Sequence, residues 1–177
     1  MSSKINAGDS FPTIKVTNYD GSEVILGNPR NGCSWQAVFV YRGQHCPICT
    51  SYLGEISDYT EKFADAGVDI IAVSADSQAQ LQNHLEDISI NYPVAYGLTE
   101  QQMKALGLYI STPRSEKETD HNFAEPALFV INEKGQVHIV EIANAPFVRP
   151  KLDTLVSGLA FIRNPDNDYP IRGTLVY

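Results

Sequence analysis

The chain alternates short apolar runs with amphipathic stretches, and this order predicts an α/β protein. Residues 35–41 and 68–75 are mainly apolar and β-forming, which is typical of buried strands. Residues 47–66 and 78–88 place apolar side chains three and four positions apart, so each predicts a helix with one apolar face. Strand, helix, strand, helix in this order predicts a right-handed parallel unit.

The rest of the chain predicts a second group of strands and helices around that unit. Residues 13–16 and 23–26 flank an Asp20-Gly21 turn of the kind that joins a tight hairpin. Further strands are expected at 93–97, 126–132 and 136–142, and further helices after residue 99 and from residue 150.

Two segments lack a clear periodicity. Residues 109–123 are rich in Ser, Thr, Pro and charge, and predict a loop inserted before the next strand. This loop either shapes the entrance to an active site or is a solvated excursion. Residues 164–177 predict a tail that lies over the surface.

Composition and charge favour a single globular domain over residues 1–177. The 177 residues are 43% hydrophobic and 19% charged, without an internal repeat or a low-complexity linker. The net charge of −8 argues against nucleic acid or an anionic membrane as partner. Residues 1–6 have no apolar signal core and no stretch is long enough to span a bilayer, so we expect a reducing cytoplasm.

A Cys46-Pro47-Ile48-Cys49 motif lies where the strand at 35–41 ends and the next helix begins. The unpaired amides and the dipole of a helix N-terminus favour a thiolate there, which is the reactive form of cysteine. We expect Cys46 to be the nucleophile on an exposed lip. Cys49, one turn further on, is placed to form a reversible disulfide with it.

Other interpretations of the two cysteines stay open at this point. The pair is either half of a zinc site, a structural disulfide, or inert buried thiols. No metal or cofactor is expected, because Cys33 and the four histidines form no ligand pattern and there is no glycine-rich phosphate loop. Cys33 is interpreted as a bystander and His138, on an alternating strand, as a surface residue.

With these segments together, the chain resembles the thioredoxin-fold superfamily and, within it, the redoxin branch of alkyl hydroperoxide reductase/thiol-specific antioxidant (peroxiredoxin-like) proteins. The resemblance rests on residues 7–12 with 20–21, 41–49, 71–76, 125–131 and 134–137. It implies a central mixed β-sheet flanked by helices. It also implies that Pro126 lies beside the two cysteines with a cis peptide bond, which would turn backbone groups of Glu125 toward a thiol substrate.

The chain departs from the family's Pro-x-x-x-Thr-x-x-Cys pattern, in which the Thr and a distant Arg hold a peroxide. Aligned on Cys49, Arg42 replaces the Pro and Cys46 replaces the Thr, and the strand position of the family's arginine holds Glu125 or Ala127. The alignment makes Cys49 the peroxide-reactive cysteine, whereas the position at the helix end favours Cys46. Both assignments stay open.

Side chains next to the motif have two interpretations each. His45 either carries a positive charge that lowers the thiol pKa or faces water, and Tyr41 either points its hydroxyl into the pocket or belongs to the core. Glu125 either raises the pKa of a neighbouring thiol through like charge or serves as a proton relay. In a peroxidase, the developing charge would be stabilised by one of three arginines: Arg42, Arg114 or Arg149.

Three functions are compatible with these residues. The first is a dithiol oxidoreductase that acts on protein or small-molecule thiols and disulfides and is recycled by an external thiol reductant. The second is a peroxidase that reduces hydrogen peroxide or alkyl hydroperoxides through a sulfenic acid. The third is a non-enzymatic redox-sensing module whose acidic surface binds a partner. A homodimer is a further expectation.

Overall fold

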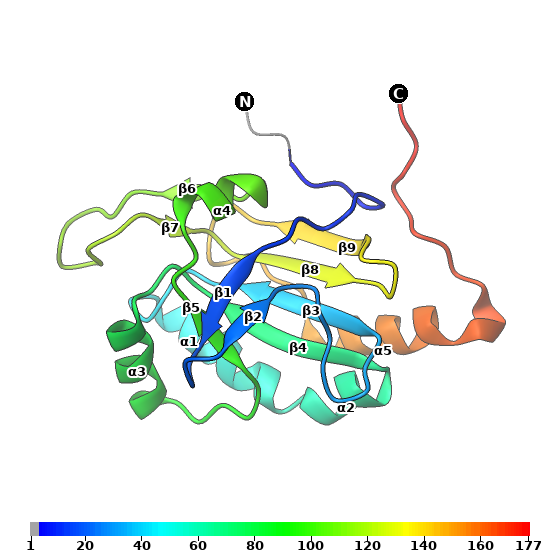
Figure 1. The fold of residues 1–177 in the computed structure, drawn as a ribbon, viewed down its shortest axis with the longest axis horizontal. Helices are drawn as coiled ribbons and strands as arrows, with labels where there is room; N and C mark the ends of the chain where they lie inside the picture. The colour runs from blue at the N-terminus through cyan, green and yellow to red at the C-terminus, as the bar shows by residue number, and fades with distance from the viewer. Residues whose placement is uncertain (1–3) are drawn as a thin grey trace.

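The computed structural model describes residues 4–177 and is built on a seven-stranded mixed sheet (Figure 1). Residues 1–3, the start of the expected domain, lie outside the described residues. The strands are β1 (Lys15–Asn18), β2 (Glu23–Ile25), β3 (Trp35–Val40), β4 (Val68–Val73), β5 (Val94–Tyr96), β8 (Ala127–Ile131) and β9 (Val137–Ile142). Their order across the sheet is β2-β1-β5-β4-β3-β8-β9.

Strand direction follows the sequence pattern closely. β3, β4 and β5 run parallel in the centre, while β1 and β8 pair with them in the antiparallel sense. β3 and β4 are buried along their whole length, which explains their apolar runs. The predicted central mixed sheet with a parallel unit is confirmed.

Five helices and one short 3₁₀ helix accompany the sheet: α1 (Pro47–Ser57), α2 (Thr60–Asp65), α3 (Gln78–Asp87), α4 (Glu100–Ala105), α5 (Leu152–Arg163) and η1 (Pro165–Asn167). Buried side chains of α1, α2, α3 and α5 form one core cluster with one face of the sheet, and Met103 of α4 belongs to the cluster on the other face. Figure 1 shows α4 well separated from α2 and α5. The sheet is therefore covered on both sides.

The helix predicted over residues 47–66 is wrong in one respect, because it is two helices. α1 ends at Ser57 and α2 begins at Thr60. The Ser57 carbonyl accepts hydrogen bonds from Asn91 Nδ2 and from Thr60 Oγ1, both at 3.2 Å. These side chains occupy the carbonyl that a continuous helix would use, so the chain turns there.

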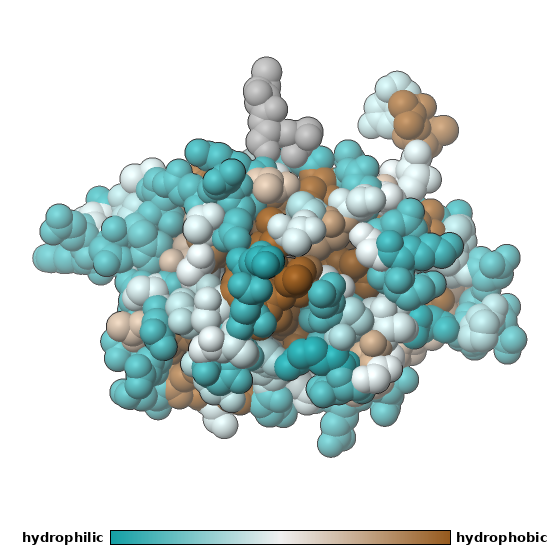
Figure 2. Space-filling view, in the orientation of Figure 1, coloured by the Kyte–Doolittle hydropathy of each residue, from teal (hydrophilic) through white to brown (hydrophobic). Residues whose placement is uncertain are grey.

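The segment expected as a plain loop over residues 109–123 is anchored by a small sheet. β6 (Ile110–Ser111) pairs with β7 (Phe123–Ala124) in the antiparallel sense. Residues 112–122 join these strands, and Figure 2 shows that this part of the surface is hydrophilic. The base of the segment is thus fixed on the body of the protein while its polar turn projects outward.

The exposure of one residue of β9 differs from the prediction. His138 was expected on the surface, but it is buried, and its ring lies 4.6 Å from that of Trp35. β9 contributes to a covered face there, which alternation alone does not reveal.

Residues 168–177 extend away from α5, with Leu175, Val176 and Tyr177 largely exposed (Figure 1). No helix among residues 4–177 is long and apolar enough to cross a membrane.

Candidate active site

The two cysteines of the motif occupy the first turn of α1. Cys46 is the N-cap residue, with extended backbone angles, and Pro47 takes the first helical position. The Cys46 sulfur accepts a hydrogen bond from the backbone N–H of Cys49 at 3.4 Å. That amide is one of the donors a helix leaves unpaired, so the helix start favours negative charge on this sulfur.

The loop before Cys46 is held by a buried carboxylate. Asp76, which is fully buried, accepts a hydrogen bond from the backbone N–H of Gln44 at 2.8 Å. Gly43 has a φ of +141°, and a Cβ atom at this position would collide with the Asp76 carboxylate. Only glycine fits this close approach, so Asp76 and Gly43 together fix the path of the chain into the motif.

Arg42 brings a positive charge to the Cys46 sulfur. Its guanidinium acts electrostatically on that sulfur and lies 4.7 Å from the centre of the Phe123 ring. It also forms ion pairs with Glu125 at 3.3 Å and Glu118 at 3.8 Å, measured between nitrogen and oxygen. The guanidinium is therefore shared between two carboxylates and a thiol.

These contacts make Cys46 an acidic thiol. The pKa of Cys46 is lowered to about 5, against the opposing effect of burial. The largest cause is a hydrogen bond from the Cys49 thiol, and the Cys49 amide and the Arg42 guanidinium add to it. Near neutral pH the group is a thiolate, which is the nucleophilic form.

Cys49 has the opposite character while Cys46 is a free thiolate. Donation of its proton to Cys46, together with burial, raises the pKa of Cys49. Arg149 opposes this rise, because its Nη2 donates to the Cys49 sulfur at 2.7 Å while Nη1 donates to the Ile48 carbonyl at 3.3 Å. Arg149 comes from the loop between β9 and α5, so a distant part of the chain supplies a cation to Cys49.

Cys46 does not lie on an exposed lip, as the sequence suggested. It is 2% exposed and Cys49 is 0% exposed. Burial follows because Cys46 packs in the same core cluster as Leu53 and Phe39. A substrate must therefore enter a pocket or displace a covering segment to reach sulfur.

A small pocket does reach Cys49. It has a volume of about 20 Å³, which is room for roughly one water-sized molecule. Its lining is mostly apolar, with Cys49, Tyr41, Pro126 and Arg149 among the contributing residues. Tyr41 is buried, which raises the pKa of its hydroxyl, and it both belongs to the core and lines the pocket.

His45 does not supply the positive charge that the sequence allowed. Burial and the neighbouring Arg42 lower the pKa of His45 to about 4, so the ring is neutral near pH 7. It does not face water freely either, because its ring centre lies 4.5 Å from that of Phe123. Its role is packing over the motif.

Pro126 lines the pocket beside Cys49, but its expected cis peptide bond is wrong: the chain from residue 4 to 177 contains no cis bond. The Glu125 backbone N–H donates to the Tyr109 carbonyl at 2.8 Å instead of facing a substrate. The Glu125 carboxylate accepts from Ser111 Oγ at 2.6 Å and pairs with Arg42. Glu125 is therefore paired with Arg42, and the pKa of Cys46 is low although this carboxylate is nearby.

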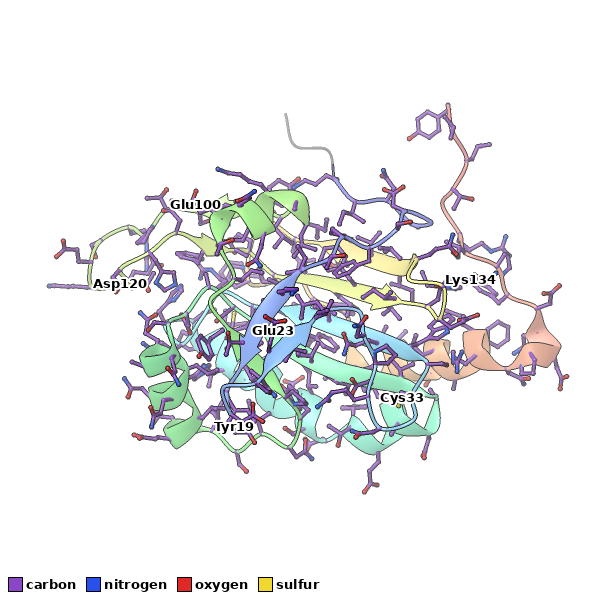
Figure 3. All side chains as sticks on the ribbon, viewed as in Figure 1. Tyr19, Glu23, Cys33, Glu100, Asp120 and Lys134 are labelled. Carbon is purple, nitrogen blue, oxygen red and sulfur yellow. The ribbon has the colours of Figure 1, made fainter. Side chains whose placement is uncertain are left out.

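The remaining candidates lie apart from the motif. Figure 3 shows Cys33 at the far end of the sheet from Asp120 of the 112–122 segment. Arg114 contacts Glu118 and not a cysteine. Within the described part of the chain, no three His, Cys, Asp or Glu side chains gather as metal ligands.

Three contributors were missed or barely weighed from the sequence. Asp76 directly follows the segment predicted as a buried strand. A carboxylate at the end of a parallel strand could have been recognised from the sequence as a candidate site residue. Arg149 was one of three arginines with nothing to distinguish it. Glu118 had no signal at all, because its approach to Arg42 depends on how residues 112–122 fold back.

Comparison with known proteins supplies a family. The sequence profile described as the AhpC/TSA family matches residues 7–140. A crystal structure of a peroxiredoxin-like protein from Aquifex aeolicus superimposes with a TM-score of 0.73 at 21% identity, covering 89% of this chain and 87% of that one. This likeness confirms the predicted thioredoxin-like fold class.

Two relatives illustrate the range of names among similar sequences. A 1-Cys peroxiredoxin of Medicago truncatula is 23% identical over 144 residues, covering 76% of this chain and 63% of the relative. The thiol-disulfide oxidoreductase ResA of Bacillus cereus is 24% identical over 136 residues, covering 76% and 68%. The chain spans 39% to 63% of the length of three relatives named 1-Cys peroxiredoxin.

Proposed function

Because the chain belongs to the AhpC/TSA family, we propose that it is a thiol-dependent oxidoreductase working through a reversible Cys46–Cys49 disulfide. The observation that carries this proposal is the division of roles within the pair. Cys46 is an acidic thiol at a helix N-terminus, and the Cys49 thiol one turn away donates to it. An attacking thiol that is ionised near neutral pH, with a second thiol one turn away, supports thiol–disulfide exchange.

In the first step, the Cys46 thiolate attacks one sulfur of a substrate disulfide. A bond forms between Cys46 and that sulfur, and the second substrate sulfur leaves as a thiolate. The thiolate charge is stabilised before attack by the Cys49 amide and by Arg42.

In the second step, Cys49 attacks the Cys46 sulfur. Once Cys46 is bonded to substrate it no longer accepts the Cys49 proton, so the contact that raised the pKa of Cys49 is lost. Arg149 then favours the Cys49 thiolate, and the proton passes to the departing substrate thiol. The products are the reduced substrate and a Cys46–Cys49 disulfide, which an external thiol reductant reopens.

Peroxide reduction at Cys49 is a second candidate, favoured by a specific observation. The pocket of about 20 Å³ opens onto Cys49 beside Arg149, so a path for a small molecule leads to this sulfur and to a neighbouring cation. In this route the proton of Cys49 would first move to Cys46. The Cys49 thiolate would then attack one peroxide oxygen, and the other oxygen would leave with that proton as water or an alcohol, giving a sulfenic acid on Cys49. Cys46 would then condense with it, forming the same disulfide and a second water.

The single-cysteine variants Cys46→Ser and Cys49→Ser, assayed with a disulfide substrate and with hydrogen peroxide, separate these functions. We expect Cys46→Ser to lose disulfide exchange by at least about 100-fold, because no other thiol has its low pKa. Cys49→Ser should instead accumulate a mixed disulfide. If peroxide consumption depends on Cys49 and survives in Cys46→Ser, the peroxidase is correct. A wild type that turns over neither the disulfide nor the peroxide would point to a non-enzymatic redox-sensing module.

The setting of this chemistry is also a proposal. A thiol reductant and thiol or disulfide substrates, with peroxides as the alternative, follow from the two steps above. A reducing cytoplasm would keep the dithiol form available. The excess of negative charge supports partners that are neither nucleic acid nor anionic membrane. A homodimer remains an expectation that light scattering on the purified chain would test.

A further inference from the structure

The segment of residues 112–122 is connected to the reactive thiol by a chain of charged contacts. Glu118 lies within it, and the Glu118 side chain is only 9% exposed. Its carboxylate accepts from the Arg114 backbone N–H at 2.7 Å and from Arg114 Nε at 3.2 Å. The same carboxylate lies 3.8 Å from the Arg42 guanidinium, which also pairs with Glu125 and acts electrostatically on the Cys46 sulfur.

The segment is fixed on the body of the protein at two further places. Gln80 of α3 donates to the Asp120 carboxylate at 3.0 Å. His121 Nε2 lies 3.6 Å from Asp76, the carboxylate that holds the loop before Cys46. The position of Glu118 is therefore set by contacts around the motif, and displacing the segment would take Glu118 away from Arg42.

Arg42 has more anionic neighbours than it can fully compensate. Its side chain is 18% exposed, and it faces Glu118 and Glu125 as well as the sulfur of Cys46. In such a shielded position opposite charges interact strongly, so each carboxylate reduces the field that the guanidinium exerts on the sulfur. Glu125 belongs to the framework beside β8, whereas Glu118 belongs to a segment that projects from it.

We propose that Glu118 is a positioning residue that moderates the reactivity of Cys46 through Arg42, so that the placement of residues 112–122 sets the strength of the nucleophile. The inference rests on the proposed function only in taking Cys46 as the reactive thiol. With the segment in place, Arg42 is divided between Glu118 and sulfur. With the segment displaced by an incoming partner, Arg42 serves the thiolate more fully.

The test uses the full-length reduced protein carrying Glu118→Gln. Removing the carboxylate charge should lower the pKa of Cys46, because Arg42 is then less compensated. The pKa is measured from the pH dependence of alkylation, with mass spectrometry identifying Cys46 as the modified residue. The equilibrium constant for opening the Cys46–Cys49 disulfide with glutathione should rise by roughly threefold to tenfold, since a more stable thiolate stabilises the reduced form.

Glu116→Gln is the matched control. Glu116 lies two residues before Glu118 and is exposed, so this change removes the same charge from a side chain in solvent. It should change neither measurement. A double-mutant comparison identifies the route: in an Arg42→Met background, Glu118→Gln should have no more effect than Glu116→Gln. A structural role for Glu118 would instead appear as a loss of stability without a downward shift of the pKa.

Two outcomes would overturn the proposal. One is that Glu118→Gln raises the pKa of Cys46, or that the pKa of Cys46 is the same in Glu118→Gln and in Glu116→Gln. The other is that its effect persists without Arg42. If the Cys46–Cys49 disulfide never forms in the wild type, the proposed function fails, while the alkylation measurement still decides whether Glu118 acts on Cys46.

Discussion

At the scale of single residues, the two thiols differ because their neighbours differ, although both belong to one helical turn. Cys46 accepts hydrogen bonds and faces Arg42, whereas Cys49 donates and faces Arg149. Each thiol thus has its own guanidinium. The order of the two chemical steps follows from this asymmetry, because Arg149 becomes effective only after Cys46 has reacted.

Arg149→Met tests the assignment of the second step. In a Cys46→Ser background, which removes the acceptor of the Cys49 proton, Arg149→Met should raise the pKa of Cys49 by about one unit or more, since a buried thiolate loses its cation. The pH dependence of Cys49 alkylation measures this. Arg172→Met is the control, because that guanidinium lies 5.0 Å from the Tyr169 ring in the tail. Equal pKa values in both variants would remove Arg149 from the mechanism.

At the scale of elements, the site depends on how the β3–α1 loop is held. The start of α1 supplies the amide to Cys46 only if residues 42–45 approach it along a fixed path. Asp76, three residues after β4, fixes that path by accepting a hydrogen bond from the Gln44 N–H and by leaving no room for a side chain at Gly43. One strand end therefore shapes the reactive end of the neighbouring helix.

Gly43→Ala should disturb this arrangement. The positive φ and the collision with Asp76 predict a loss of about 1–3 kcal/mol in the free energy of unfolding, measured by urea denaturation. The pKa of Cys46 should rise as the loop moves. Gly54→Ala in α1 is the control, because nothing lies within 4 Å of its added Cβ and alanine favours helix. A Gly43→Ala protein as stable as wild type would contradict the proposed role of Asp76.

The elements themselves were predictable where a local pattern determines them. β3 and β4 are buried on both faces, so their sequences are apolar throughout and easily recognised. The break between α1 and α2 was missed, because it depends on Asn91, far along the chain. The cysteine motif could be located, yet its burial could not, since the segments covering it fold back from elsewhere.

At the scale of the whole molecule, the site is assembled from regions that no local pattern connects. Arg149 reaches Cys49 from 100 positions further along the chain. Glu118 reaches Arg42 from the segment between β6 and β7. The motif between a strand and a helix located Cys46 and Cys49. Resemblance to a family placed Pro126 beside them, but it also suggested the cis bond that the described residues lack. The shared framework was transferable, whereas the charged contacts specific to this chain were not.

The stability of the whole protein should carry the signature of the acidic thiol. The pKa of Cys46 is about 5 in the folded state and about 8.5 in an unfolded chain. Between these values the unfolded chain holds a proton that the folded protein does not, so the free energy of unfolding rises with pH. This contribution is complete above the unfolded pKa and is lost as pH falls through 5.

His45 acts in the same direction over a lower range. Its pKa is about 4 in the fold, against 6.5 ordinarily, so its contribution is gained as pH rises through that interval. Of these two groups, only Cys46 still contributes above pH 6.5. The free energy of unfolding of the reduced wild type should therefore rise by at most about 2–3 kcal/mol between pH 6.5 and 8.5. Urea denaturation of wild type and Cys46→Ser at several pH values separates the two groups. Because serine does not titrate there, the gain should vanish in Cys46→Ser, and parallel curves would mean that Cys46 is an ordinary thiol.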